Sequence, residues 1–246
     1  MIKDVGSRLR VALLISGSGT TAQEIIRASK SGQLHVEPAC VIASHMHAGG
    51  IKRALQEGVP RKDILIIRRR DYSSREAFGE VILEACRKRA IDVVGQYGWM
   101  EKTPANVIEV YSHMMINQHP GPLDPGRPDF GGKNMFGRRV HCARLWFVRR
   151  IQQDYWTEAT AQRVAVEYDA GAILKIGRVE IVPTDDVFSL QERVLAQEHK
   201  IHIETLNDFV NGNIKEIVRE KPLVSKEHAP LLVKAKQIAG LLFPRG

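Results

Sequence analysis

The stretch RVALLISGSGTTAQEIIRASKSG, which covers residues 10–32, indicates the fold of the chain. It begins with a short, mostly apolar run that ends at a glycine, which is typical of a buried strand. The residues that follow place Ala22, Ile25 and Ile26 on one helical face and stop at Gly32, as an amphipathic helix does. A strand, a glycine loop and a helix in this order predict one unit of an α/β sheet.

The same alternation continues through the first half of the chain. Strand patterns lie at residues 38–44, 64–68, 91–98 and 112–118, and helical patterns lie at residues 49–58 and 73–90. The second of these helices opens with a capping pattern made by Ser73, Ser74 and Glu76. Continuous apolar strands separated by helices are typical of sheets that are covered on both faces. We therefore predict an α/β fold with an open, mostly parallel, twisted sheet, helices on both faces and right-handed crossovers.

The second half of the chain has a different pattern. Residues 121–137 are rich in proline and glycine and predict an ordered or mobile loop. A helix at about 138–153, strand-like runs at 159–168 and 172–182, and a long helix at 186–211 follow it. We expect one domain over residues 1–246, with a core at about 10–212. The tail, 213–246, is expected to hold a packed helix, and its sequence indicates no particular role.

Composition limits the classes of function. The 246 residues carry a formal charge of +8, but the basic residues come in short runs without interleaved aromatic residues, so no nucleic-acid partner is expected. Three widely spaced cysteines indicate a reducing, cytoplasmic setting, and no stretch is apolar enough for a signal peptide or a membrane span. His45 and His47 have no acidic or cysteine neighbour, so we expect no metal. Partners are expected to be small molecules, with the chain a monomer or homodimer.

The loop ISGSGTT offers an anion site after the first strand. Gly17 and Gly19 stand where backbone N–H groups at a helix start can bind a phosphate. The letters GSGTTA also fit a loose dinucleotide pattern, which expects an acidic residue at the end of the second strand. That strand ends in Ser44 and His45 instead, which favours a monophosphate site. A purely structural tight turn remains the alternative.

A second polar group lies in INQHPGP, residues 116–122. Asn117 and His119 follow an apolar strand, at the sheet edge where α/β folds bind ligands. Alternate residues of a strand share a face, and Pro120 keeps His119 extended. A carboxamide donor and an imidazole together suit acyl transfer, because one stabilises an oxyanion and the other carries a proton. A helix cap and a satisfied loop histidine are the alternative interpretation.

Asp169, in VEYDAGAIL, is the third candidate. Ala170 and Gly171 after it let the backbone turn tightly. A carboxylate near an imidazole fixes its tautomer and favours its charged form. From the sequence alone, Asp169 is equally consistent with a turn residue.

Six motifs in order resemble the glycinamide ribonucleotide formyltransferase family over roughly residues 10–212: ISGSGTT, SREAF, INQHPGPLDP, FGGKNMFGRRVH, EYDAGAIL and QEHKIH. The resemblance implies a Rossmann-related formyltransferase fold. It also implies a metal-free enzyme of purine biosynthesis that transfers a formyl group from the co-substrate 10-formyltetrahydrofolate to the amine of glycinamide ribonucleotide.

The resemblance also assigns roles to residues. Asn117 would bind the formyl oxygen, His119 would stabilise the oxyanion, and Asp169 would keep His119 protonated and assist proton transfer. Glu198 would contact the substrate ribose. The substrate phosphate would be bound by Gly19, Thr20 and Thr21. The folate pterin would lie against the backbone of Met100, Glu101, Lys102 and Thr103 and of the segment from Val164 to Asp169.

The chain departs from the family pattern at three positions. Glu101 stands where the family often has arginine, Gln162 stands where it has histidine, and Ala170 replaces a glycine. These departures affect substrate identity more than reaction class. The alternatives are another folate-dependent formyltransferase, a formyltetrahydrofolate hydrolase, or a non-catalytic nucleotide-binding module.

Overall fold

The computed structural model describes residues 8–246, which divide into two compact units. The N-terminal unit comprises the described residues up to Asn117 together with His202–Ile214. The C-terminal unit comprises Gln118–Ile201 and Lys215–Gly246. A single domain over residues 1–246 therefore stays a prediction.

The strands of the N-terminal unit are parallel, as the sequence predicts. Strand β1 pairs in parallel with β2 on one side and with β4 on the other. Strand β3 pairs in parallel with β2, and β5 with β4. The full sheet has seven strands in the order β3-β2-β1-β4-β5-β6-β7, where β6 spans Trp156–Arg163 and β7 spans Ile173–Glu180. The mostly parallel α/β fold is confirmed. The last two residues of β5 belong to the C-terminal unit. The bounds are β1(Leu9–Ile15), β2(Val36–Ala43), β3(Ile64–Ile66), β4(Val93–Gln96) and β5(Met115–His119).

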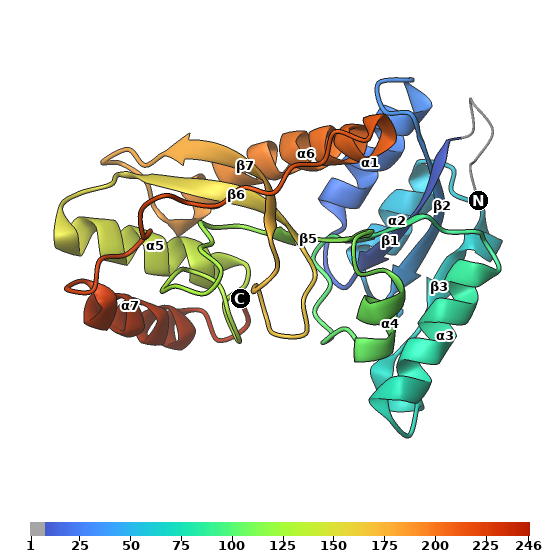
Figure 1. The fold of residues 1–246 in the computed structure, drawn as a ribbon, viewed down its shortest axis with the longest axis horizontal. Coiled ribbons are helices and arrows are strands. Elements are labelled where there is room, and N and C mark those ends of the chain that lie inside the picture. The colour runs from blue at the N-terminus through green and yellow to red at the C-terminus, as the bar shows by residue number, and fades with distance from the viewer. Residues whose placement is uncertain (1–7) are drawn as a thin grey trace. The chain divides into compact units, whose positions relative to one another are not determined.

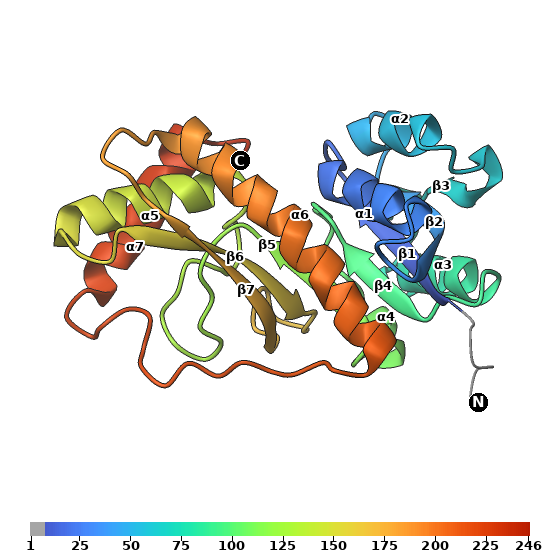
Figure 2. The same ribbon diagram turned by 90° about the horizontal axis from the view of Figure 1, so that it is seen from above.

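Helices cover these strands on both sides. In Figure 2, α1 and α2 lie on one side of β1 and β2, and α3 lies on the other. Residues 11–15 of β1 are fully buried as a result. The sequence did not predict the short helix α4, which spans fewer than two turns and lacks a long periodic pattern. The bounds are α1(Thr20–Lys30), α2(Gly49–Gln56), α3(Arg75–Arg87) and α4(Ala105–Val110), with 3-10 turns at η1(Arg61–Asp63) and η2(Arg69–Asp71).

The strand order fixes where a ligand can bind in this unit. The chain runs from β1 outward to β2 and β3, and then returns to place β4 on the other side of β1. The carboxyl ends of β1 and β4 are therefore the point where the winding reverses. In open α/β sheets the crevice outside such strand ends is the usual ligand site. The loop that begins at Ser16 starts there.

The C-terminal unit contains an antiparallel pair, β6(Trp156–Arg163) and β7(Ile173–Glu180). Both strand-like runs predicted from the sequence form strands, but β6 starts and ends earlier than expected. Its register shifts between Ala161 and Gln162, which marks a bulge. The helices are α5(Arg138–Ile151), α6(Val187–Asn211), which continues into the N-terminal unit, and α7(Ala229–Leu242).

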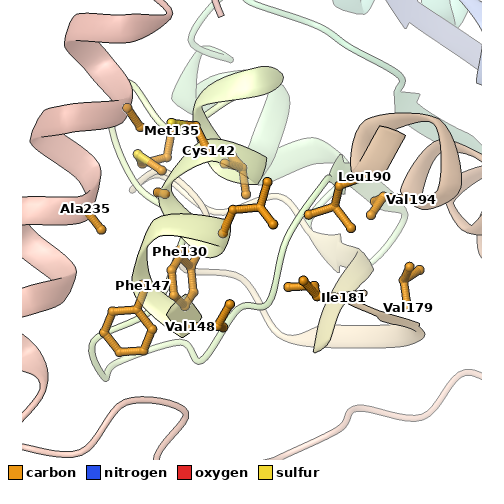
Figure 3. Packing of buried hydrophobic residues seen from close by; sticks show 14 of the residues in the cluster. Phe130, Met135, Cys142, Phe147, Val148, Val179, Ile181, Leu190, Val194 and Ala235 are labelled. Atoms are coloured by element: carbon orange, nitrogen blue, oxygen red, sulfur yellow. The ribbon is translucent and has the colours of Figure 1, made fainter. Parts of the chain in front are cut away.

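Helices α5 and α7 lie side by side and form much of the core of this unit (Figure 1, Figure 2). The fully buried Ala235 and Ala239 allow α7 a close approach. Phe130, from the loop 121–137, is fully buried and meets Phe147 of α5 edge to face, with ring centroids 5.4 Å apart (Figure 3). A fully buried aromatic ring anchors a segment strongly. The proline- and glycine-rich loop is therefore held by the core.

None of the helices within residues 8–246 combines the length and apolar composition that a membrane span requires.

Cys40, Cys86 and Cys142 are all buried and all free. Burial raises the pKa of the Cys40 thiol to about 12 and that of the Cys86 thiol to about 11, which keeps both protonated at neutral pH.

The cap of α3 gives a first prediction. Ser74 is the N-cap, and its hydroxyl accepts a hydrogen bond from the Ala77 N–H at 3.0 Å. Replacing Ser74 with alanine should lower the free energy of unfolding by about 1 kcal/mol, because one helix N–H loses its acceptor. Urea unfolding measures this change. Ser73→Ala is the control and should be close to native; equal losses in both variants would contradict the capping role.

Candidate active site

The glycine loop of the N-terminal unit is a tight turn at the start of α1. Gly19 is the N-cap residue and has a φ of 69°, in the left-handed region. A Cβ at Gly19 would lie 2.5 Å from the Gly50 Cα, so only glycine fits. No side chain within the described residues caps α1. The first N–H groups of the helix are thus available for an anion, and Thr20 and Thr21 stand directly beside them.

Ser16 ties this loop to the neighbouring strand ends. Its hydroxyl accepts a hydrogen bond from the Met100 N–H at 2.9 Å and from the Ser44 hydroxyl at 2.7 Å. Its own N–H donates to the Gly98 carbonyl at 3.0 Å. The carboxyl ends of β1, β2 and β4 are joined in this way, which fixes the loop against the segment that begins at Met100.

The other predicted residues of the N-terminal unit lie in β5 or in the segment that follows β4. Asn117 is half-buried in β5 and stands in register with Gln96 of β4. The Gln96 side chain donates to the buried Thr103 hydroxyl, which orders the segment between them. Met100 is exposed, whereas Glu101 and Lys102 are half-buried.

His119 and Asp169 come together in the C-terminal unit. The His119 Nδ1 lies 3.6 Å from the Asp169 Oδ2, which is within reach of an ion pair but too long for a hydrogen bond. The His119 side chain is buried, and its Nε2 has no hydrogen-bond partner among residues 8–246. A buried imidazole nitrogen without a partner is costly. The imidazole thus faces a carboxylate with Nδ1 and keeps Nε2 open. This arrangement suits a group that polarises a bound carbonyl.

Two hydrogen bonds hold the Asp169 carboxylate, one at each oxygen. The Gly132 N–H donates to Oδ2 at 2.8 Å, and the Gln162 Nε2 donates to Oδ1 at 2.8 Å. Together the two donors fix the orientation of the carboxylate. Asp169 also has a φ of 55°, a left-handed conformation that aspartate tolerates better than most residues. The anchoring keeps Oδ2, which also accepts from Gly132, facing His119.

Gly171 explains why the sequence DAG serves at this turn. A Cβ at Gly171 would lie 1.9 Å from the Arg163 carbonyl oxygen, so a glycine is required there. Ala170 is exposed, and the side chain it adds points away from the core. The departure from the family pattern therefore falls at the position that accepts a methyl group.

Glu198 is a buried acid on α6. Burial raises the pKa of its carboxyl to about 8, and a hydrogen bond from Gln118 opposes this rise. Its Oε1 has no partner among the described residues. At neutral pH the group is therefore mostly protonated, so it can donate a hydrogen bond as well as accept one.

Two further histidines are buried without a metal-like arrangement. Burial, and then the charge of His119, lower the pKa of His141 to about 3, so His141 is neutral at physiological pH. His202 is fully buried and lies edge-on to Tyr97, with ring centroids 5.3 Å apart. No group of three or more metal-ligating side chains occurs in the part of the chain that the structure describes.

The structure thus brings His119 and Asp169 together within one unit and adds Gln162, which the sequence marked only as a departure. Lys236 and Gln118 were also missed, since their contacts join segments far apart in the chain. The remaining predicted residues belong to the two units as follows. Val164 and Glu198 lie in the C-terminal unit, and Gly19, Thr20, Thr21, Met100, Glu101, Lys102, Thr103 and Asn117 lie in the N-terminal unit.

Comparison with known proteins identifies the relatives of this chain. The sequence pattern of the family described as Formyl transferase matches residues 9–206. A phosphoribosylglycinamide formyltransferase of Haemophilus influenzae is 28% identical and covers 84% of this chain and 89% of its own length. Glycinamide ribonucleotide transformylase 1 of Symbiobacterium toebii superposes with a TM-score of 0.75 at 26% identity, over 89% of this chain and 98% of that one. A phosphoribosylglycinamide formyltransferase of Coxiella burnetii in complex with CHES is 30% identical. It superposes with a TM-score of 0.72 over 88% of this chain and 96% of that one.

The raised pKa of Glu198 predicts how stability depends on pH. The buried carboxyl keeps its proton up to about pH 8, whereas in the unfolded chain it ionises near 4.5. The native protein should therefore lose stability as pH rises from 4.5 to 8, by roughly 1.4 kcal/mol per unit from this group. In Glu198→Gln this loss should disappear. Urea unfolding at pH 5 and pH 8 measures the difference, and an equal slope in both proteins would contradict it.

Proposed function

Because the chain belongs to the formyl transferase family, we propose that it transfers a formyl group from 10-formyltetrahydrofolate to the primary amine of glycinamide ribonucleotide, a step of purine biosynthesis. Two of the compared relatives carry the name of this activity. The observation that carries the proposal is the His119 imidazole, buried beside the doubly anchored Asp169 carboxylate.

The reaction requires a base and an oxyanion site. The amine nitrogen bonds to the formyl carbon, the formyl oxygen becomes negative, and the bond to the folate nitrogen then breaks while a proton moves from the amine to that nitrogen. The folate supplies the activated formyl group. His119 stabilises the oxyanion through its unpartnered Nε2, and Asp169 favours the charged imidazole and assists the proton transfer.

Asn117 adds a neutral donor to the same oxygen. It stands two residues before His119 in β5, and alternate residues of a strand present their side chains on one face. Its carboxamide N–H carries no charge to be neutralised, so it can bind the formyl oxygen before and after the oxygen becomes negative.

The remaining residues bind the two substrates. The substrate phosphate is bound by the N–H groups that follow Gly19 and by the Thr20 and Thr21 hydroxyls, at the uncapped start of α1. Glu198, protonated at neutral pH, binds the ribose hydroxyls as donor and acceptor. The folate pterin binds along the backbone of residues 100–103 and 164–169. Gln162 offers a buried Oε1 that has no partner among residues 8–246 and suits an N–H of the pterin.

One assay tests the function. The purified protein is given 10-formyltetrahydrofolate with glycinamide ribonucleotide, an amino-sugar nucleotide, methionyl-tRNA, or no acceptor, and released tetrahydrofolate is followed by absorbance. Release that depends on glycinamide ribonucleotide is the expected result. Formate release without an acceptor would instead identify a hydrolase, and no turnover with any acceptor would favour a nucleotide-binding module.

The oxyanion role of Asn117 predicts a loss of turnover without a loss of binding. Asn117→Ala should lower kcat by about a hundredfold, because one oxyanion donor is removed, while KM stays nearly constant. Asn117→Asp keeps the size of the side chain, removes the N–H donor and adds a negative charge beside the oxyanion, so its loss of kcat should be at least as large. A rise in KM that accounts for the whole effect would contradict this role.

The phosphate loop predicts the opposite pattern. Gly19→Ala places a methyl group 2.5 Å from the Gly50 Cα and displaces the loop. We expect KM for glycinamide ribonucleotide to rise by about tenfold or more, since several N–H donors no longer point toward the phosphate. KM for the folate should change little. Gly17→Ala is the matched control, because its Cβ meets no described atom within 4 Å. Similar effects of both variants on KM would contradict the assignment.

A further inference from the structure

The C-terminal helix α7 brings a cation to the loop that holds Asp169. The Lys236 Nζ donates a hydrogen bond to the Gly131 carbonyl oxygen at 2.7 Å, across 105 residues of sequence. The lysine is half-buried, and α7 packs against α5 through its buried alanines. This helix lies beyond residue 206, where the family pattern ends. The contact is therefore supplied by a segment beyond the residues that the family pattern matches.

One peptide group connects this lysine to Asp169. The Gly131 carbonyl and the Gly132 N–H belong to the same peptide bond, and in a trans peptide they point in opposite directions. The carbonyl accepts from Lys236, and the N–H donates to the Asp169 Oδ2 at 2.8 Å. An ammonium, a peptide and a carboxylate thus form one row. Hydrogen bonds in such a row polarise one another, so the cation makes the N–H a stronger donor.

The loop is shaped to carry this peptide. A Cβ at Gly131 would lie 2.8 Å from the Asp169 Cβ and 2.5 Å from the Leu123 Cδ2, and Gly132 has a φ of 96°. The Asp129 Oδ1 accepts from the Gly131 N–H at 2.9 Å, so the preceding peptide is held as well. Two glycines are required here by close approach and by conformation.

The charges around Lys236 agree with this arrangement. Burial lowers the pKa of its ammonium group, and the Asp129 and Asp169 carboxylates oppose that change. Both carboxylates therefore stabilise the charge of Lys236, while its hydrogen bond goes to the Gly131 carbonyl oxygen.

We propose that Lys236 is a positioning residue for the formyl transfer. Through the Gly131–Gly132 peptide it holds the Asp169 Oδ2, the oxygen that faces His119, and so keeps the carboxylate in this orientation. The role rests on the proposed function, because it serves the carboxylate that the reaction uses. The lysine acts on Asp169 through this peptide and through its charge, and its hydrogen bond goes to the Gly131 carbonyl oxygen.

The test compares Lys236→Met with Lys234→Met. Methionine keeps the length of the side chain and removes the charge and the donors, and Lys234 is an exposed lysine on the same helix. In Lys236→Met, kcat should fall by about tenfold, the loss of one charge-assisted hydrogen bond, with KM for both substrates within about twofold of native. Lys234→Met should be native in both constants.

A spectroscopic measurement tests the row of hydrogen bonds without any substrate. The sequence contains only two Gly-Gly pairs, Gly49–Gly50 and Gly131–Gly132. In protein labelled with glycine that carries carbonyl ¹³C and ¹⁵N, only the Gly50 and Gly132 amides show one-bond coupling to a labelled carbonyl. The Gly132 amide proton and the Gly131 carbonyl carbon should both move upfield in Lys236→Met. The Gly50 signal is the internal control and should stay in place.

The outcomes separate the two proposals. If the native protein transfers no formyl group, the proposed function fails, and the spectra still report on the Lys236 row. Unchanged Gly132 and Gly131 signals in folded Lys236→Met would contradict the row of hydrogen bonds from Lys236 to Asp169. A native kcat in that variant would contradict the positioning role. A native Gly132 amide that exchanges with solvent as fast as an exposed glycine would overturn the row even if the variant did not fold.

Discussion

The anchoring of the Asp169 carboxylate is the constraint on which the candidate site depends. One oxygen is held by the side chain of Gln162 and the other by the backbone of Gly132, and the second oxygen lies within ion-pair reach of His119. The donors come from β6 and from the loop 121–137, so the carboxylate can keep this orientation only while both segments stay in place. Phe130 in the core fixes the loop, and Gly171 allows the turn that carries Asp169 to approach β6. Packing in the C-terminal unit is thus what sets the geometry of the acid.

Burial leaves two further ionisable groups, His141 and Glu198, uncharged at neutral pH. It lowers the pKa of His141 to about 3 and raises that of Glu198 to about 8, so both are neutral when the enzyme works. Glu198 keeps its capacity to donate and accept hydrogen bonds, which suits hydroxyl groups of a sugar. The same physical cause, removal from water, therefore leaves both groups uncharged and prepares Glu198 for binding.

Much of the fold could be predicted from sequence, because it rests on local periodicity. The strand, glycine loop and helix at residues 10–32 have patterns that are read within a short window, and Gly19 has the left-handed φ that its loop requires. The antiparallel direction of β6 and β7 was not predicted, since strand-like runs carry no sign of their partner. Gln162 turns toward Asp169 beside a bulge in β6, and one residue of register decides where a side chain points. Lys236 could not be found at all, because its contact depends on how α7 packs against α5.

The central claim is that the negative charge of Asp169, and not its shape alone, drives formyl transfer through His119. Single-turnover formyl transfer by Asp169→Asn tests this most directly, because asparagine keeps the size of the side chain and removes the charge. The account predicts a rate at least about a hundredfold below native with substrate binding retained. A rate within about threefold of native, in a variant that binds both substrates normally, would contradict it.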